Sequence, residues 1–332
     1  MRAAAILGLG CSPKHLRPFQ AVQSQINDKI EWQMGLPASA HHADVVILFG
    51  GDGTIHRHLA PLVRLGLPVL IVPAGSGNDF ARALGLRRMR DSLEAWRKFR
   101  ARAENVRAID LGVIAPIIED AGKVPAPHDP SRDSGLTARY FCCVAGVGLD
   151  AEVSRRANLL PRWLRGNGGY VFSLLSMIFR FSPIRMKIRK PAEGLNQAED
   201  ANRGMPQIND TDAAWTIVSD QPTILAAFAN TPTYGGGMKI APQARMDDGL
   251  LDVCVVGAVD PFKLFCMFPT VYGGRHLQIR EVQYSQAACV RVETEHPLDV
   301  YADGEFVCRT PVEVWIHSAA LRVIVHPSQT SV

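Results

Sequence analysis

A glycine-rich turn directly after a buried strand is the feature that most constrains the fold of this 332-residue chain. Residues 45–49 read VVILF, an apolar run that is typical of a strand buried on both faces. The sequence GGDGT follows at Gly50–Thr54, and a helix is predicted from Ile55 to Leu65. Glycines at such a turn let backbone N–H groups approach an anion at the helix N-terminus. Because Asp52 lies in the same turn, we expect the anion to be a phosphate that carries a metal ion.

A second glycine-rich turn follows the next predicted strand. Residues 68–73 read PVLIVP, and AGSGND follows at 74–79. The carboxyl ends of neighbouring parallel strands meet at one crevice, so both turns would line the same ligand site. Strands and helices alternate throughout this half, which indicates a parallel α/β sheet. The other elements predicted here are a strand at 3–9, a helix at 14–29, a short strand at 30–34, and helices at 80–84 and 91–102.

Strand-like runs dominate from residue 139 onward, with one predicted helix at 168–181. Polar segments at 119–138 and 191–211 are predicted to be surface loops. We therefore predict an α/β domain at 1–116, a mostly β domain at 117–319 and a tail at 320–332. The predicted strands are 139–145, 184–189, 214–219, 223–229, 250–256, 288–294, 298–301, 306–315 and 320–326.

Charge and cysteine content exclude several classes of protein. The net charge of +4 is too small to indicate a nucleic-acid partner, and we expect none. Seven cysteines without a C-x-x-C spacing favour reduced thiols and argue against structural zinc. No apolar stretch reaches the roughly 18 residues that a membrane span requires. We expect a cytoplasmic protein.

Four sequence blocks together closely resemble the catalytic region of the diacylglycerol kinase and sphingosine kinase family, nearest to the bacterial soluble lipid kinases. Beside the two glycine-rich turns, these are APQARMDDGLLDV at 241–253 and DGE at 303–305. The blocks keep the family's order and cover residues 45–315. NAD kinases share the GGDGT turn, but the later blocks favour lipid kinases.

The resemblance implies a Rossmann-like, NAD kinase-like α/β domain, a sandwich-like β domain, and a last strand that returns to the first domain. It also implies that the γ-phosphate of ATP is transferred to a hydroxyl of a lipid such as diacylglycerol, at a site between the two domains. ATP and Mg²⁺ are the implied cofactors, and a lipid is the implied partner.

The resemblance also assigns roles to individual residues. Glu305 is implied as the proton acceptor for the lipid hydroxyl, with Asp303 beside it, and Asp52 as the residue that positions Mg²⁺. A second metal site, which we expect to be structural, is implied at Arg245, Asp248 and Leu250. The nucleotide-binding positions are Gly50, Gly51, Asp52, Gly53, Thr54, Gly75, Ser76 and Asn78.

Two departures from the family pattern leave alternatives open. Arg57 occupies a position where the family has Glu, and residues 10–13 read GCSP where the family has an Asn-Pro loop. The alternatives are a non-catalytic nucleotide- or lipid-binding pseudokinase and a kinase of a soluble substrate such as NAD. The sequence does not decide which lipid is used, and a homodimer stays open.

A basic segment at 155–190 carries nine Lys and Arg residues and no Asp or Glu. Its apolar run, 168–181, is most often typical of a buried helix, and we expect partial burial together with docking at a membrane interface. Cationic flanks favour contact with anionic headgroups, at about 1 kcal/mol per Lys or Arg near the surface. We therefore expect transient peripheral membrane contact through this segment.

Overall fold

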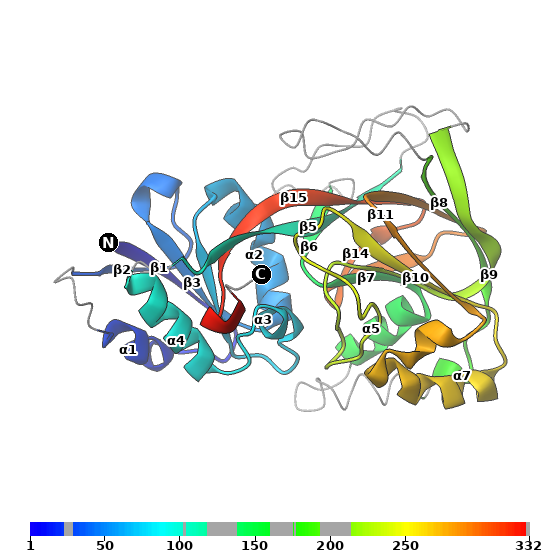
Figure 1. Cartoon of the computed structure of the whole chain (residues 1–332), viewed down its shortest axis with the longest axis horizontal. Helices are drawn as coiled ribbons and strands as arrows, with labels where there is room; N and C mark the ends of the chain where they lie inside the picture. The colour runs from blue at the N-terminus through cyan, green and yellow to red at the C-terminus, as the bar shows by residue number, and fades with distance from the viewer. Residues whose placement is uncertain are drawn as a thin grey trace. The chain divides into compact units, whose positions relative to one another are not determined.

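The computed structural model describes residues 1–22, 29–101, 104–117, 138–159, 175, 177–192 and 214–329. The chain forms two compact units, Met1–Ile109 with Ala319–Val332, and Asp110–Ser318. Two strands run from one unit into the other, β5 (Val106–Pro116) and β15 (Val312–Ile324) (Figure 1). The boundary between the two units lies between Ile109 and Asp110, within β5, whereas the expected boundary at residue 116 is the last residue of that strand.

The first unit contains a parallel sheet of β1 (Arg2–Leu7), β2 (Glu31–Met34), β3 (Val45–Gly50), β4 (Val69–Pro73) and the end of β15. Their order is β15–β4–β3–β1–β2. Every residue of β3 is buried, as a strand covered on both faces requires. Val323 of β15 pairs in parallel with Val69, so the end of the chain lies in this sheet. The parallel α/β prediction is confirmed.

The helices of the first unit are α1 (Pro13–Gln20), α2 (Asp52–Leu65), α3 (Asp79–Ala83) and α4 (Met89–Arg100). Helix α2 buries one stripe of apolar residues, Ile55, Leu59 and Leu62. It ends at Gly66, whose φ of 60° suits a residue without a side chain. The prediction of a helix over 14–29 was wrong at its C-terminal end, because α1 stops at Gln20. Apolar spacing continues at Val22, but spacing alone does not fix where a helix ends.

The second unit is mostly β, as predicted, and its pairings are largely antiparallel. Its central strand is β9 (Trp215–Ala229), which pairs with β7 (Val144–Gly148), β8 (Ile184–Pro191) and β10 (Leu251–Gly257). The apolar core includes Val147, Phe228, Val253, Val290 and Val314, contributed by five different strands. The remaining strands are β6 (Arg139–Phe141), β11 (Val282–Ala287), β12 (Cys289–Thr294), β13 (Asp299–Ala302) and β14 (Glu305–Arg309).

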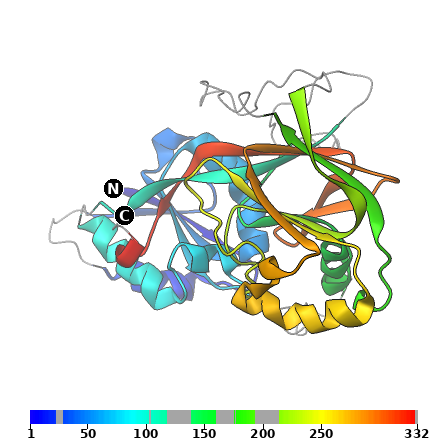
Figure 2. The same cartoon turned by 45° about the vertical axis from the view of Figure 1, so that its right-hand side comes forward.

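Several elements of the second unit differ from the prediction. The expected strands 214–219 and 223–229 are the single strand β9, and the run 306–315 divides between β14 and β15. Two helices were missed, α5 (Leu149–Leu159) and α7 (Pro261–Met267). Both lie on the same side of the strands (Figures 1 and 2). Most of the expected helix 168–181, and of the loops 119–138 and 191–211, lies outside the described residues. None of the helices within the described ranges is long and apolar enough to cross a membrane.

A buried asparagine connects the returning strand to the first unit. Asn105 is 2% exposed, and its side-chain amide donates to the carbonyls of Ala95 (3.0 Å) and Val325 (3.2 Å). The backbone carbonyl of Asn105 accepts from the Val325 amide at 2.9 Å. One side chain thus connects the end of the chain to α4.

We expect Asn105→Ala to lower the free energy of unfolding by about 1–3 kcal/mol, because two buried carbonyls would lose their donor. Urea unfolding followed by circular dichroism measures this change. Lys98→Ala, an exposed change on the same unit, should stay within about 0.5 kcal/mol of wild type. Equal stability of the two variants would contradict the role assigned to Asn105.

Candidate active site

The two predicted glycine-rich turns touch through their backbones in the first unit. The Ala74 amide donates to the Gly50 carbonyl at 3.1 Å. A Cβ atom added to Gly51 would lie 2.8 Å from the Cα of Gly75, and one added to Gly75 would lie closer still to Gly51. No side chain fits between these turns, so both positions require glycine. The prediction that the turns lie together is confirmed within this unit.

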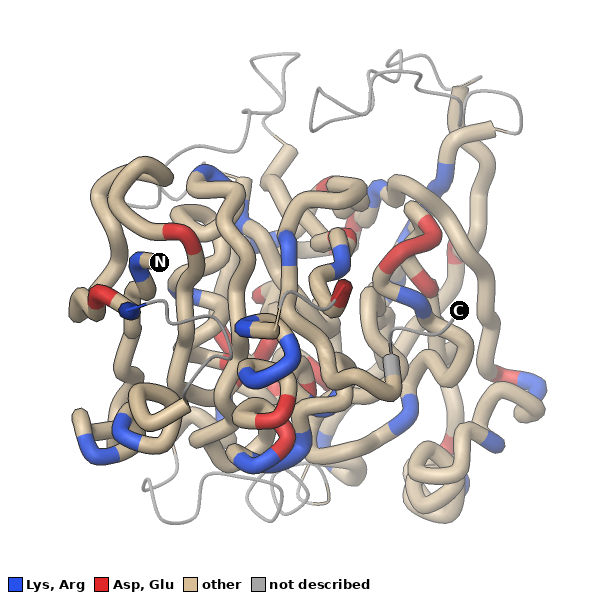
Figure 3. Tube along the Cα trace, turned by 60° about the vertical axis from the view of Figure 1, so that its left-hand side comes forward, with Lys and Arg blue, Asp and Glu red and all other residues tan. Residues whose placement is uncertain are grey.

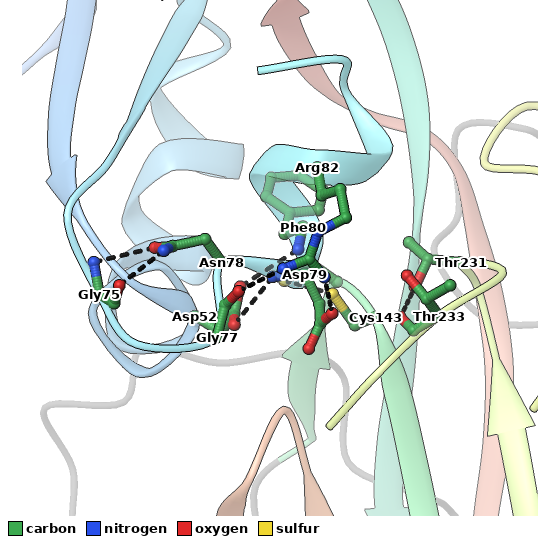
Figure 4. Close-up of polar contacts among 11 residues, drawn as sticks. Asp52, Gly75, Gly77, Asn78, Asp79, Phe80, Arg82, Cys143, Thr231 and Thr233 are labelled. Carbon is green, nitrogen blue, oxygen red and sulfur yellow. Dashed lines mark hydrogen bonds and ion pairs between the residues drawn. The ribbon is translucent and has the colours of Figure 1, made fainter. Parts of the chain in front are cut away.

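Asp52 bridges the starts of two helices. Its two carboxylate oxygens accept hydrogen bonds from the backbone amides of Asp79 and Phe80, each at 3.1 Å (Figure 4). These amides belong to the first turn of α3, where they lack partners within the helix and where negative charge is favoured. Asp52 therefore fixes the second turn relative to the first.

Asn78 closes the second turn. It has a φ of 56°, a left-handed conformation that asparagine tolerates better than most residues. Its Oδ1 accepts from the Gly75 amide at 2.9 Å, and its Nδ2 donates to the Gly75 carbonyl at 2.6 Å (Figure 4). Gly75 and Ser76 are exposed at the tip of the turn. A hydroxyl and a rigid loop backbone are thus presented to solvent.

Asp79 and Arg82 were not among the predicted site residues, although Asp79 is the last residue of the AGSGND turn at 74–79. Asp79 is 5% exposed and forms an ion pair with Arg82, which also donates to the Gly77 carbonyl at 2.8 Å. Both carboxylates face Gly77, since a Cβ atom there would lie 2.9 Å from Asp52 Oδ2 and 3.7 Å from Asp79 Oδ2. The i, i+3 spacing of Asp79 and Arg82 could have indicated this pair.

One of the backbone amides predicted to bind phosphate, that of Thr54, already donates a hydrogen bond within the first turn of α2. The Thr54 amide donates to the Gly51 carbonyl at 2.9 Å, and the Thr54 side chain packs against Gly50 and Gly8. Arg57, which replaces the family's Glu, is exposed and donates through Nε to the Gly53 carbonyl at 2.9 Å. A guanidinium therefore lies one helical turn from the glycine-rich loop.

The altered first loop also lies close to β3. The Gly8 amide donates to the Phe49 carbonyl at 2.7 Å, and the Cys11 amide donates to the Gly8 carbonyl at 3.0 Å. Partial burial raises the pKa of the Cys11 thiol, with a smaller opposing effect from the Gly8 backbone. Cys11 is therefore a neutral thiol at physiological pH.

The DGE turn of the second unit is fixed by Asp303. Its carboxylate accepts from two consecutive amides, Cys142 at 2.9 Å and Cys143 at 2.8 Å. Asp303 has a φ of 51° and Gly304 a φ of 82°, so the turn is left-handed at both residues. Asn158 of α5 donates to the Gly304 carbonyl at 2.7 Å. Glu305 begins β14 immediately afterwards and is half-buried.

A buried asparagine links this turn to the other second-unit sequence block. The Asn230 side chain donates to the carbonyls of Cys142 (3.1 Å) and Asp110 (2.9 Å). Asp110 in turn accepts from the Gly249 amide at 2.8 Å. The blocks at 241–253 and 303–305 are thus held by one hydrogen-bond network, which the sequence did not indicate.

The residues predicted to form a second metal site lie on one exposed turn. Asp248 Oδ1 accepts from the Leu250 amide at 3.1 Å, and Arg245 pairs with Asp247 at 3.2 Å. Gly249, which lies between Asp248 and Leu250, adopts a φ of 73°. Besides Asp247, which pairs with Arg245, the turn offers the Asp248 carboxylate and backbone carbonyls, the oxygen ligands that suit Mg²⁺ or Ca²⁺.

Asp252, in the same block, was missed as a buried carboxyl. It is fully buried on β10, accepts from the Tyr284 hydroxyl, and lies 3.3 Å from the Gln286 amide. Burial raises its pKa, the two hydrogen bonds lower it, and Asp248 raises it slightly. Its Oδ2 has no hydrogen-bond partner among the described residues. The position of Asp252 directly after two leucines did not predict that its side chain is buried.

An apolar cavity of about 70 Å³ lies in the second unit between α5, α7 and the strands. Its walls are mostly aliphatic and aromatic, and they include Leu225, Val256, Leu264, Met267 and Phe268. His276, which also lines it, is 2% exposed, and burial lowers its pKa despite the opposing bond to the Ile240 carbonyl. The histidine is therefore neutral, and the cavity carries no cation from it.

We expect Gly75→Ala to lower the free energy of unfolding by about 1–3 kcal/mol, because the added methyl group would collide with the Gly51 backbone. Denaturant unfolding measures the effect. Gly273→Ala is the matched control, since its nearest neighbour would be 3.8 Å away. A Gly75→Ala protein as stable as this control would show that the turns do not need their close contact.

Comparison with known proteins identifies the family. The diacylglycerol kinase catalytic domain matches residues 16–114, and the YegS C-terminal NAD kinase beta sandwich-like domain matches residues 143–325. A diacylglycerol kinase of Mycobacterium tuberculosis is 33% identical over 287 residues, covering 86% of this chain and 78% of its own. A diacylglycerol kinase of Bacillus subtilis is 25% identical over 278 residues, covering 83% and 76%.

A crystal structure of a diacylglycerol kinase from Bacillus anthracis shares the fold, with a TM-score of 0.59 at 18% identity and coverage of 98% of this chain and 97% of that one. The predicted fold class, an α/β unit followed by a mostly β unit, is confirmed. The chain belongs to the diacylglycerol kinase family, and it is a diacylglycerol kinase-like lipid kinase, a phosphotransferase to an alcohol group.

Proposed function

We propose that this lipid kinase transfers the γ-phosphate of ATP to a hydroxyl of a diacylglycerol-like lipid. The observation that carries the proposal is the pair of touching glycine-rich turns braced by Asp52. Such rigid backbone at the start of α2 suits a polyphosphate, because helix N-termini present amides and a positive dipole end to anions. The exposed Ser76 hydroxyl adds a donor at the same place.

The acidic groups around Gly77 fit a magnesium ion. Asp52 and Asp79 both direct carboxylate oxygens toward Gly77, and oxygen ligands are those that Mg²⁺ prefers. Asp52 would hold the ion directly or through water, because its oxygens keep a second lone pair beside each amide bond. When bound, magnesium offsets negative charge on the phosphoryl group during transfer.

Arg57 adds a positive charge near this nucleotide site. Its position one turn into α2 is compatible with attraction of the triphosphate, even though the family has an acid there. The substitution therefore changes the local charge without removing any of the contacts that brace the two turns. We infer that it changes nucleotide affinity rather than abolishing transfer.

Glu305 is the general base in this proposal. It is half-buried at the start of β14, on a turn held by the Cys142 and Cys143 amides and by Asn158. A fixed, partly desolvated carboxylate is well suited to accept the proton of an attacking hydroxyl. Asp303 already accepts two amide hydrogen bonds, so we assign it the role of positioning Glu305.

The apolar cavity supports a lipid as the acceptor. Its volume of about 70 Å³ exceeds the roughly 10–15 Å³ that one water needs, and its lining is almost wholly apolar. A soluble acceptor such as NAD would gain little from such walls, whereas hydrocarbon would be stabilised by leaving water. We infer that part of an acyl chain occupies this cavity.

We expect Glu305→Gln to lower kcat for phosphate transfer at least about 100-fold, because the amide cannot accept the proton. Transfer of label from γ-labelled ATP to diacylglycerol, other long-chain alcohols or NAD measures activity and acceptor class together. Glu295→Gln, an exposed glutamate elsewhere on the second unit, is the matched control and should retain activity.

If the Glu305→Gln variant still phosphorylated lipid at the wild-type rate, Glu305 would not be the general base. Labelling of NAD alone would overturn the lipid assignment, and nucleotide binding without transfer to any acceptor would overturn the proposed reaction.

We also propose that the turn containing Arg245, Asp248 and Leu250 holds a second, structural divalent cation. Magnesium or calcium should then raise the Tm, and Asp248→Asn should abolish most of that increase, because it removes the only carboxylate in the set. Thermal unfolding with EDTA and with added metal measures both. Asp247→Asn controls for general loss of charge. Equal metal-induced shifts in wild type and Asp248→Asn would contradict this site.

A further inference from the structure

Helix α7 carries apolar side chains on two sides, of which one lines the cavity and the other is exposed to water. Asp260 caps the helix by accepting from the Phe262 amide at 2.9 Å and the Lys263 amide at 3.2 Å. Leu264 and Met267 line the apolar cavity on the inner side. Phe262 is 69% exposed and Phe265 43% exposed on the outer side. The helix is therefore apolar on both sides, although the outer side faces water.

One aromatic residue from a distant segment, Phe179, extends this outer side, and Tyr272 is exposed on the turn after α7. Tyr272, in the 3-10 turn η3 (Phe268–Gly273), is 41% exposed and contacts Phe268. Phe179 is 58% exposed, and its ring centroid lies 6.0 Å from that of Phe265, although the two residues are far apart in sequence. We call Phe179, Phe262 and Phe265 the aromatic face. Clustered exposed aromatics of this kind mark interaction surfaces.

Positive charge is concentrated in the described residues of α7 with its N-cap, of the turns that follow it up to residue 282, and around Phe179. Two acids lie there, Asp260 and Glu281, and Glu281 pairs with Lys263 at 2.7 Å. Lys239 is adjacent to η3, because its amide donates to the Val271 carbonyl at 3.1 Å. The cations outnumber the acids and are all exposed; they are Arg180, Lys239, Lys263, Arg275 and Arg280.

Four of the described arginines of the segment 155–190 are already paired with acids. Arg155 and Arg156 pair with Glu152, and Arg185 pairs with Asp220. Arg189 is 8% exposed and pairs with Glu293. Figure 3 shows Lys and Arg along much of the described trace, interspersed with Asp and Glu. Of the described part of 155–190, Phe179 and Arg180 are the residues that join the aromatic face.

We propose that the aromatic face docks on an anionic membrane surface, with the phenylalanine rings inserted at the interface and the surrounding cations on the headgroups. Aromatic rings favour the membrane–water interface, and Lys and Arg favour anionic headgroups. Leu264 and Met267 of the same helix line the cavity, so the proposed acyl-chain site lies next to the docking face. The proposal rests on the proposed lipid kinase function, since that function requires access to a bilayer.

Vesicle flotation without nucleotide tests the docking itself. Wild type should bind phosphatidylcholine vesicles containing phosphatidylglycerol more tightly than pure phosphatidylcholine vesicles, and salt should weaken binding. Phe262→Ser with Phe265→Ser should weaken binding roughly tenfold or more, because two apolar rings no longer leave water. Met34→Ser with Ile217→Ser, two residues that are each 56% exposed elsewhere, should leave binding unchanged.

A fluorophore on α7 gives a second readout that does not depend on the phenylalanine variants folding well. Cys266 is exposed on α7, whereas Cys142, Cys143, Cys254, Cys289 and Cys308 are buried. An environment-sensitive dye on Cys266, in a Cys11→Ser background, should shift to the blue with anionic vesicles. Vesicle binding without a spectral shift would show that another face docks, and would overturn the proposal.

The remaining outcomes separate docking from catalysis and from self-association. Binding needs no turnover, so a protein that fails to phosphorylate any lipid can still confirm the docking face. Equal vesicle binding by wild type and the double phenylalanine variant would overturn it, whatever the activity. A wild-type dimer in light scattering that the phenylalanine changes convert to monomer would also overturn it, because the face would then cover a second copy.

Discussion

The carboxylate of Asp52 is the interaction on which the first unit's site depends. It is the partner of two amides at the start of α3, which would otherwise be unsatisfied at the helix N-terminus. Hydrogen bonds to a charged acceptor are stronger than neutral ones. The same bonds set the distance between the two glycine-rich turns, where only glycine fits. Asp52 thus shapes the site as well as supplying charge to it.

The second unit repeats this arrangement with different elements. Asp303, like Asp52, precedes a glycine and accepts from two consecutive backbone amides. In one unit the carboxylate holds a helix start, and in the other it holds the bend between β6 and β7 against the β13–β14 turn. In both units the aspartate fixes the backbone around the groups to which we assign chemistry. The roles proposed for Ser76 and Glu305 depend on this fixed backbone.

The apolar features of the second unit give the lipid kinase function a physical basis. A cavity with almost no polar lining lies on the inner side of α7, and exposed aromatic residues lie on its outer side. Neither feature stabilises a soluble fold, because one leaves space unfilled and the other leaves hydrocarbon in water. Both are suited to a substrate that must leave a bilayer.

The sequence by itself determined the α/β and β halves, both glycine-rich turns and the family, because these depend on local periodicity and on residue types at fixed spacing. It did not reveal that Asp303 accepts hydrogen bonds from the Cys142 and Cys143 amides, that Asn230 links two distant blocks, or that Asp252 is buried. It also missed α5 and α7 and the aromatic face. Helix α7 is capped locally by Asp260, so the sequence did carry a signal for it. Tertiary structure alone decided the contacts of Asp303 and Asn230, the burial of Asp252 and the aromatic face, because each joins segments far apart in the chain, and a residue's neighbours in space leave no period in its sequence.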